Sequence, residues 1–427
     1  MSNESERRPL SLFEGYGIEI ECPLVDATSF DVLPVADRLL RRAAAEANGV
    51  AVDQQGWVGD VEDGAIEWSN ELVNHVLEFK TAGPVPRLDG IAAAFRVSQR
   101  RADDIARRLG ARLVPGAMHP WMRPSDETVL WRHENSEIYA TYDRLFDCKR
   151  HGWANLQSVH LNLPFANDDE FGRLLAAVRV VLPLVPALAA ASPWIEGRAT
   201  GLLDNRLEVY RTNSAKVGAM TGAVIPEQVF DRAGYRTAVF DPIDAQLTAL
   251  GVGEPFIGVE WTNARGAIAR FDRMAVEIRL IDSQEHAGAD LAVCAAVTEL
   301  VRGLVDERWS SGARQRAFSA GPLLALLIDA TARGRDARLP GPEYAALFGF
   351  ESDAPSTCGE LFARLLPDAF RGPVELEEPL RVLLEHGTLA ERMLSALGSA
   401  ERPDRAALRD QLEALAECLI EGRPYLP

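Results

Sequence analysis

Four separated segments of the chain alternate apolar and polar residues at every second position. They are Tyr16–Cys22, Val73–Thr81, Leu156–Pro164 and Met274–Ile281. Successive side chains of a β-strand point to opposite faces, so a period of two predicts strands with one apolar and one polar face. We therefore expect a sheet that packs its apolar face against the protein core.

Segments rich in Ala, Leu and Arg lie between and after these strands and are typical of helices. The predicted helices are Val35–Asn48, Leu88–Leu109, Asp168–Ala191 and Ala287–Trp309. Glycine follows the first two, as it often does where a helix ends. Pro183 and Pro186 should bend or break the third, because proline removes a helical hydrogen bond. Pro and Gly residues make Ser192–Gly201 a predicted loop.

This pattern divides the chain into three parts. Residues 1–13 are polar and predict a flexible tail, whereas residues 14–309 carry all four strands and predict a mixed α+β domain. From about residue 310 to Pro427, helical stretches alternate with loops rich in Pro and Gly. We expect this last part to be a helical subdomain packed on the domain before it.

The composition narrows the choice of partners. The 427 residues include 63 Asp and Glu against 45 Lys and Arg, a net charge of −18, and 47% are hydrophobic. This composition is typical of a globular protein in solution, and its acidic field opposes DNA or RNA as a partner. The sequence shows no signal peptide or membrane-spanning stretch. Five scattered cysteines without a C-x-x-C pair predict free thiols in a cytoplasmic protein.

The polar faces of the four strands carry residues that can bind metal or take part in catalysis. They are Glu19 and Glu21, then Glu78 and Lys80, then Ser158, His160 and Asn162, and finally Glu277 and Arg279. An antiparallel sheet with one solvated face shows the same alternation, so a plain wet surface is the alternative for each strand. Four carboxylates on one face repel one another unless cations lie between them. We therefore expect them to line one hollow that binds divalent metal.

Nucleotide phosphate is the ligand that such a metal site favours. Mg²⁺ prefers oxygen ligands and leaves positions for water or phosphate oxygens. Arg279, Arg206 and Arg211 could stabilise the charge of a transferring group, with a surface role as the alternative for the last two. The chain contains no glycine-rich phosphate loop, no G-x-G-x-x-G, no H-E-x-x-H and no G-x-S-x-G motif. A nucleotide would therefore be held by metal and carboxylates.

Three histidines and one cysteine are weaker candidates. His119, His133 and His151 could each act as a catalytic base, and a structural role is the alternative for each. Cys22 directly follows Glu21 and should point to the opposite face of its strand. We interpret it as a structural thiol.

Six motifs occur in an order that is more specific than any one of them alone. They are Gly17-Ile-Glu19-Ile-Glu21, Val76-Leu-Glu78-Phe-Lys-Thr81, His119-Pro120, Ser158-Val-His160-Leu-Asn-Leu-Pro164, Thr200-Gly201 leading to Arg206, and Val276-Glu277-Ile-Arg279-Leu-Ile-Asp282. Together they resemble the glutamate-cysteine ligase family, and most closely its bacterial carboxylate-amine ligase branch. Ala332-Arg333-Gly334 and Gly387-Thr388 followed by Arg392 resemble C-terminal signatures of that branch, so the likeness spans Gly15 to Arg392.

The resemblance implies a fold and a set of site residues. The fold is α+β of the glutamine synthetase-like type, an antiparallel sheet curved into a funnel with helices outside it and a helical C-terminal region. Residues 14–309 become the catalytic domain, which takes ATP as co-substrate and two or three Mg²⁺ ions, with Mn²⁺ as a substitute. The implied metal ligands are Glu19, Glu21, Glu78, His160 and Glu277, with Glu71 as a further candidate. Glu277, Arg279 and Arg206 are the implied catalytic residues, and Arg211 and Asn162 are candidates for substrate binding.

One departure from the family pattern affects the number of metal ions that the site is expected to bind. The branch has His-Val-His-Val-Gly at the third strand, whereas this chain keeps only His160 and has Asn162 at the other outward place. We expect an enzyme that joins the carboxylate and amine of small amino acid substrates through an acyl phosphate, with a homodimer as one possible state. The alternatives are phosphotransfer to a small acceptor and a catalytically degenerate scaffold, which the lost histidine favours.

Overall fold

The computed structural model describes residues 8–47, 52, 55–398 and 400–427, and an antiparallel sheet lies at its centre. The strands follow the spatial order β2 (Asp60–Asp63), β3 (Ile66–Asn70), β4 (Val76–Thr81), β1 (Gly17–Asp26), β6 (Ser158–Pro164), β10 (Ala275–Asp282) and β9 (Ala267–Arg270). A further short strand, β5 (Ala111–Leu113), pairs with the end of β1. Each of these pairings is antiparallel, which confirms the expected fold class.

The four predicted strands are the four adjacent strands β4, β1, β6 and β10. The second begins at Val76 rather than Val73, because Val73 bridges to Leu130 outside the sheet. The pattern did not reveal the shorter β2, β3, β5 and β9. The predicted loop Ser192–Gly201 was partly wrong, since it contains a small hairpin of β7 (Trp194–Ile195) and β8 (Arg198–Ala199).

Helices fill the connections and most of the C-terminal part. In the first three hundred residues they are α1 (Ala36–Glu46), α2 (Ile91–Arg107), α3 (Pro124–Glu127), α4 (Ser136–Phe146), α5 (His151–Ala154), α6 (Asp168–Val181), α7 (Pro186–Ala189), α8 (Asn205–Asn213), α9 (Gly218–Thr221), α10 (Arg232–Tyr235), α11 (Asp241–Ala249) and α12 (Ala287–Val305). They continue as α13 (Gly312–Ala317), α14 (Ala320–Arg333), α15 (Pro342–Ala345), α16 (Cys358–Ala369), α17 (Glu377–His386), α18 (Leu389–Ala396) and α19 (Arg405–Glu421). Short 3₁₀ turns include η2 (Leu182–Leu184), η3 (Ala215–Val217), η5 (Glu260–Thr262) and η8 (Val374–Leu376).

The predicted helices are present with shifted ends. The break at the two prolines is confirmed, because α6 stops before Pro183 and α7 starts at Pro186. The fourth predicted helix ends at Val305 instead of Trp309, since the backbone turns at Glu307 with a positive φ of 52°. Of the first predicted helix, Asn48 lies outside the described residues. Within the described part of the chain, no helix combines the length and apolar character needed to cross a membrane.

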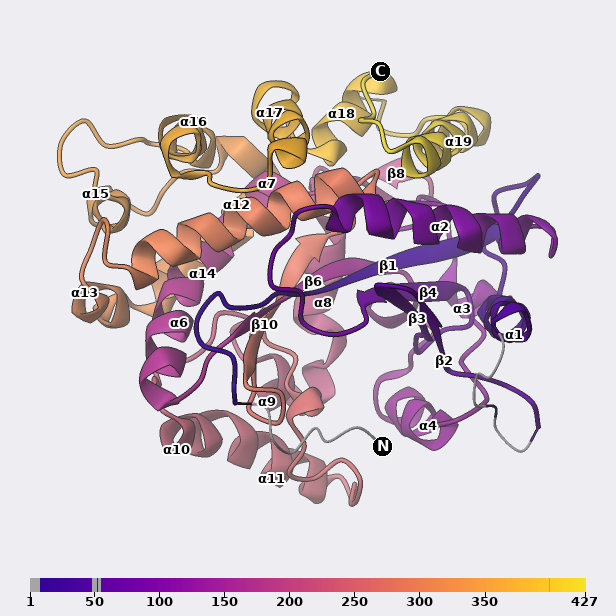
Figure 1. Cartoon of the computed structure of the whole chain (residues 1–427), viewed down its shortest axis with the longest axis horizontal. Coiled ribbons are helices and arrows are strands. Elements are labelled where there is room, and N and C mark those ends of the chain that lie inside the picture. The colour runs from indigo at the N-terminus through magenta and orange to yellow at the C-terminus, as the bar shows by residue number, and fades with distance from the viewer. Residues whose placement is uncertain (1–7, 48–51, 53–54, 399) are drawn as a thin grey trace.

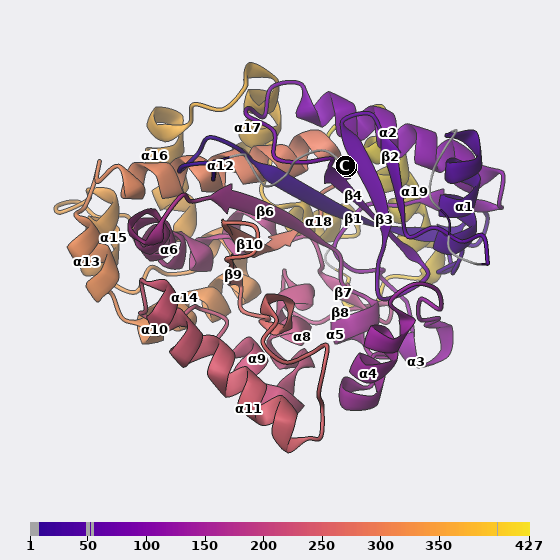
Figure 2. The same ribbon diagram turned by 60° about the horizontal axis from the view of Figure 1, so that its bottom comes forward.

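The helices lie on both sides of the sheet. Figure 1 shows α2 and α12 running along one side, with α16 to α19 beyond them, while α8, α9, α10 and α11 lie toward the other side. In Figure 2, α2, α12, α16 and α17 again lie opposite α9, α10 and α11. Fully buried apolar residues of the sheet, among them Ile18, Ile20 and Phe79, belong to the main core together with residues of α2, α6 and α12. One face of the sheet is therefore committed to packing, and the other is left for polar groups.

The segment before β1 contacts the rest of the protein. Residues 1–7 of the predicted tail lie outside the described residues. Within 8–13, the backbone N–H of Leu12 donates to Glu170 Oε2 at 3.1 Å, and the Arg302 guanidinium lies 4.2 Å from the centre of the Phe13 ring. These contacts attach the described part of the tail to α6 and α12.

A buried ion pair joins the C-terminal helices to the end of the sheet. Arg392 in α18 donates to Glu285 just after β10 at 2.6 Å and also to the Tyr425 carbonyl oxygen at 2.7 Å. The two charged side chains are 3% and 1% exposed. Burial raises the pKa of Glu285, but the Arg392 charge and its hydrogen bonds outweigh it, so the pKa of that carboxyl is lowered. The pair therefore links the C-terminal helices to the sheet electrostatically.

We predict that Glu285→Gln destabilises the protein by about 3–5 kcal/mol, because it leaves the buried Arg392 charge without its partner. In urea unfolding, Arg381→Ala should cost less than about 1 kcal/mol, since its pair with Glu385 is half exposed. An equal effect of the two substitutions would contradict a stabilising role for the buried pair of Glu285 and Arg392.

The same pair predicts a pH dependence of stability. A carboxyl with a lowered pKa in the folded state contributes fully above its unfolded pKa of about 4.3, and it loses that contribution as pH falls through the lowered folded value. The free energy of unfolding should therefore fall less steeply for Glu285→Gln than for the wild type below about pH 4. Parallel curves for the two proteins would show that the pair does not contribute.

Candidate active site

The polar face of the four central strands opens into a cavity of about 350 Å³. The residues of the four strands that line it are Glu19, Glu21, Glu78, Lys80, Ser158, His160, Glu277 and Arg279. Glu21, His160 and Glu277 are 7%, 8% and 2% exposed. The alternative of a merely solvated face is therefore wrong for these strands, because side chains of other elements enclose it.

Strand register places the acidic residues beside one another. Glu21 of β1 lies directly opposite Glu78 of β4, and Glu19 lies between Lys80 of β4 and His160 of β6. Like charges directly opposite on neighbouring strands destabilise a sheet. The pairing of Glu21 with Glu78 is thus a position at which a cation is needed.

Glu19, Glu78 and His160 form a possible metal site. One ligand atom from each of the three lies within 4.8 Å of the others. Burial raises the pKa of the Glu78 carboxyl well above its usual range, and the nearby charges of Glu19 and Glu71 add to this rise. Glu71 also lines the cavity, where burial and then the Glu21 charge raise its pKa to about 8. For both carboxyls burial contributes most to the rise, and the neighbouring carboxylates add to it.

His160 connects the carboxylates of β1. Its Nδ1 lies 2.9 Å from Glu19 Oε2, and its Nε2 lies 2.9 Å from the Ser158 hydroxyl. Burial lowers the pKa of the imidazole, but the hydrogen bond to Glu19 and the charges of Glu19 and Glu277 together outweigh it, so the pKa is raised overall. For Glu19, burial raises the pKa, but His160, Arg279 and Arg273 together lower it to about 2. The raised pKa of His160 and the lowered pKa of Glu19 thus both reflect the hydrogen bond between the two side chains.

Neighbouring groups fix the other carboxylates in place. Glu21 accepts from the backbone N–H of Ser158 at 2.9 Å and from its hydroxyl at 3.1 Å. Asn162 donates to Glu19 Oε1 at 3.1 Å, so it positions a metal-site carboxylate. Oriented oxygens of this kind, with one imidazole, are the ligand set that Mg²⁺ or Mn²⁺ takes. The residues therefore fit the expected metal.

Comparisons with known proteins agree with this geometry. A sequence model of glutamate-cysteine ligase family 2 matches residues 16–413. The chain belongs to this family. An uncharacterized protein of Archaeoglobus fulgidus is 28% identical over 94% of this chain and 98% of its own length. A Nocardioides protein that carries the provisional name glutamate-cysteine ligase 2-1 is 28% identical over 69% of each chain.

Two solved structures share the fold at low identity. The glutamate-cysteine ligase of Francisella tularensis, solved in complex with AMP, has a TM-score of 0.63 at 13% identity and covers 97% of this chain and 90% of its own. A bifunctional glutathione synthetase of Pasteurella multocida has a TM-score of 0.54 at 14% identity and covers 95% of this chain and 52% of its own. Family and fold together make this chain a glutamate-cysteine ligase-like protein.

Two arginines that the sequence did not single out surround the acidic end of β10. Arg270 of β9 donates to Glu277 Oε2 at 3.1 Å, opposite Arg279, whose Nε lies 2.7 Å from Glu277 Oε1. Arg273, in the turn between β9 and β10, lines the same cavity. Arg270 could have been found, because Ile268 and Arg270 alternate with small residues as a short strand would. Arg273 is placed by a turn that the pattern does not show.

Arg206 lines the cavity, and a buried ion pair holds its side chain. Its side chain is 1% exposed and pairs with Asp282, and its Nη2 donates to the Arg279 carbonyl oxygen at 3.2 Å. The Asp282 carboxylate holds it there and also accepts from the Ala191 backbone N–H at 2.8 Å. A role of Arg206 in binding phosphate stays a prediction, and its contacts with Asp282 and with the Arg279 carbonyl oxygen also suit a residue that positions Arg279.

Arg211 does not join the cavity lining in the structure. It follows Arg206 by five residues on α8, which at about 100° per residue points it well away from Arg206. Its Nη1 lies 2.6 Å from Glu208 instead. Its predicted contact with substrate is not supported by this geometry.

The histidines outside the strands and Cys22 take structural places. His119 is buried against the Phe30 carbonyl oxygen at 2.8 Å, and burial lowers its pKa to about 4. His133 stacks on Trp57 with ring centres 4.3 Å apart, and His151 lies 3.3 Å from Glu196. Burial raises the pKa of the Cys22 thiol well above its usual range. None of the four lines the metal cavity.

Aromatic side chains face the carboxylates from the helical side. Tyr142, Trp153, Tyr210 and Trp261 line the cavity, and the ring centre of Tyr142 lies 5.3 Å from that of Trp153 and 6.0 Å from that of Trp261.

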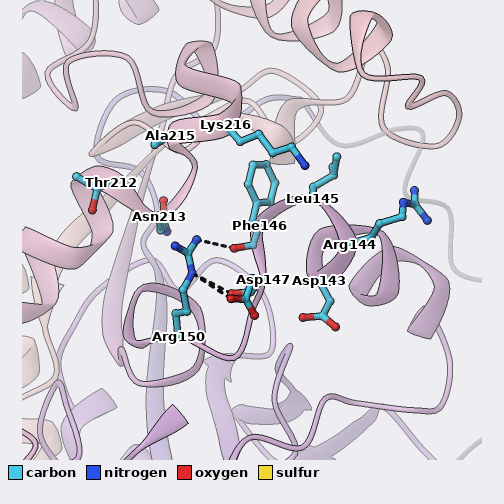
Figure 3. A pocket seen from close by; sticks show the side chains of 10 residues that line it. All are labelled: Asp143, Arg144, Leu145, Phe146, Asp147, Arg150, Thr212, Asn213, Ala215 and Lys216. Atoms are coloured by element: carbon cyan, nitrogen blue, oxygen red, sulfur yellow. Dashed lines mark hydrogen bonds and ion pairs between the residues drawn. The ribbon is translucent and has the colours of Figure 1, made fainter. Parts of the chain in front are cut away.

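Beside this aromatic wall lies a second hollow of about 410 Å³, which shares Asn213 with the cavity. Figure 3 shows its lining, where the Arg150 guanidinium is engaged with the Phe146 carbonyl oxygen and with Asp147. It contains no residue of the acidic cluster.

We predict that Glu78→Gln stabilises the metal-free protein by about 1 kcal/mol, because it removes the cost of burying an ionisable carboxyl beside Glu19 and Glu71. In Mg²⁺ the same variant should lose most of the stabilisation that the wild type gains. Chemical unfolding in EDTA and in Mg²⁺ measures both effects, with the exposed Glu62 of β2 as the matched control, Glu62→Gln. A less stable variant in EDTA would contradict the repulsion.

Proposed function

We propose that the protein is an ATP-dependent carboxylate-amine ligase that forms an amide bond through an acyl phosphate. The observation that carries the proposal is the convergence of Glu19, Glu21, Glu78, His160 and Glu277 on one enclosed face, with arginines at its edge, in a chain of glutamate-cysteine ligase family 2. ATP as co-substrate is supported by the fold shared with a ligase that was solved with AMP.

The acidic cluster would hold Mg²⁺, or Mn²⁺ in its place. Glu19, Glu78 and His160 would supply one site, and Glu21, Glu71 and Glu277 lie near enough in the same cavity to serve further ions. When bound, the metal would offset the charge of the ATP phosphates. With a single histidine on β6, the number of ions stays a prediction.

The arginines of the β9–β10 hairpin would stabilise the transferring group. A carboxylate oxygen of the substrate attacks the γ-phosphorus, and ADP leaves. Arg279 and Arg273 line the cavity, so they are placed to donate to the phosphoryl oxygens as negative charge develops there. Glu277 holds Arg279 and Arg270 on either side of it. Arg206 would position Arg279 through the backbone of β10.

The amine then completes the reaction. It attacks the acyl carbon, the bond from that carbon to the phosphate oxygen breaks, and phosphate leaves as the nitrogen loses a proton. The enclosed cavity would keep water from the acyl phosphate, and Tyr142, Trp153 and Trp261, which line it, would form the wall beside the amine. The proposed substrates are small amino acids, with glutamate and cysteine as the first pair to test.

We predict that Glu277→Gln lowers ATP turnover by at least about 10²-fold, because it releases Arg279 and removes a candidate metal ligand. The fold should persist, which circular dichroism and unfolding can check. Glu208→Gln and Arg211→Ala are the matched controls, since this partly exposed pair lies outside the cavity, and both should keep turnover within about threefold. Full activity of Glu277→Gln would exclude this site.

A mass-spectrometric screen tests the reaction itself. The protein is incubated with ATP, Mg²⁺ and mixed amino acids, and the expected product has the summed mass of two substrates minus water. ADP that forms without any amine would indicate phosphotransfer to a small acceptor. Absence of Mg²⁺-dependent nucleotide binding in calorimetry would indicate a degenerate scaffold.

A further inference from the structure

A cavity of about 430 Å³ lies beside α12 and shares no lining residue with the candidate active site. Four segments form it: Tyr16 just before β1, the β4–α2 connection, α12, and the connection from α16 to η8. Figures 1 and 2 show α12 passing beside the start of β1 with α16 and α17 on its outer side. None of the residues assigned above to the reaction lies in this cavity, which we call the α12 cavity.

The floor of the α12 cavity contains a carboxylate that lacks a partner on one side. Glu299 is 7% exposed, and its Oε1 lies 3.4 Å from Arg302 Nε. Its Oε2 is buried and has no hydrogen-bond partner among the residues that the structure describes. A buried polar atom without a partner costs free energy, and native proteins rarely leave one. The oxygen therefore indicates a donor that the described chain does not supply.

Three arginines line the same cavity as this carboxylate. Arg302 also donates to the Tyr16 hydroxyl at 2.8 Å, and Arg87 and Arg371 lie in the lining together with Asp89. Arg87 pairs with Asp89 at 2.9 Å, whereas Arg371 has no ion pair within the described ranges and donates only to the Phe370 carbonyl oxygen, at 2.7 Å. In a chain of net charge −18, three arginines converge on one cavity. Guanidinium groups are suited to carboxylate ligands.

We propose that the α12 cavity is a second ligand site, for a small organic anion that carries carboxylate groups and an N–H donor such as an ammonium group. The carboxylates would take Arg302 and Arg371, and the donor would satisfy Glu299 Oε2. An acidic amino acid has this set of groups. The proposal concerns binding alone and does not depend on the reaction proposed above.

Calorimetry with two probes tests the site. L-glutamate carries both carboxylates and an ammonium group, whereas glutarate has the same carboxylates without it. Both are titrated into the full-length protein in EDTA without nucleotide. Glutamate should bind more tightly than glutarate, and Arg371→Glu should weaken that binding about tenfold or more. Arg381→Glu on α17 is the matched charge reversal, because Arg381 is exposed and outside the cavity, and it should change the affinity less than twofold.

A second variant separates the donor from the carboxylates. Glu299→Gln keeps the size of the side chain but removes its charge, so it should abolish the preference for glutamate over glutarate. Binding of glutamate in the active site would appear as a component that Arg371→Glu leaves intact. The proposal fails if neither probe binds the wild type, if Arg371→Glu removes no component, or if Arg381→Glu weakens binding equally.

Discussion

Repulsion between carboxylates that face one another across strands is the constraint on which this structure depends. Glu21 lies opposite Glu78, and Glu19 is two residues away on the same face of β1. Antiparallel pairing fixes this register, so the charges cannot separate unless the sheet is rearranged. The surrounding structure can only supply positive charge, which it does with Lys80, His160 and the arginines near Glu277. Burial and the neighbouring carboxylates raise the pKa values of Glu71 and Glu78, and a bound cation would favour their charged forms.

The apolar face of the sheet stabilises the fold, whereas the polar face carries the candidate functional residues. Side chains that alternate with the glutamates, such as Ile18, Ile20 and Phe79, are fully buried in the main core. Their burial stabilises the strands in this register and offsets the repulsion between the glutamates, because apolar burial is the main favourable contribution to folding. A cluster that would destabilise an isolated sheet is thereby kept in place. Binding of a cation can then recover part of the free energy that repulsion costs.

The helical layers add polar contacts of a different kind. Arg392 joins α18 to Glu285 at the end of β10, and Arg206 joins α8 to Asp282 on the same strand. Both pairs are almost fully buried. One holds β10 and the other holds the residues just after it, and β10 is the strand that carries Glu277 and Arg279. The α12 cavity lies beside different elements, and its charged lining is Arg87, Arg302 and Arg371 with Asp89 and Glu299.

The sequence by itself determined the four central strands, the faces their side chains occupy and the ligand-type residues of the acidic cluster, because alternation at period two is a local property of the chain. The sequence also predicted the break in the helix after β6, because proline removes a hydrogen bond of the helix in which it lies. The short strands β2, β3, β5 and β9 were not predicted, because a few residues are too few to show a clear alternation of apolar and polar positions. Only the tertiary structure decided that Arg206 pairs with Asp282, that Arg211 turns away and that Arg273 and the aromatic wall face the glutamates. Those outcomes depend on which segments pack together, and contacts between distant parts of the chain leave no period in the sequence.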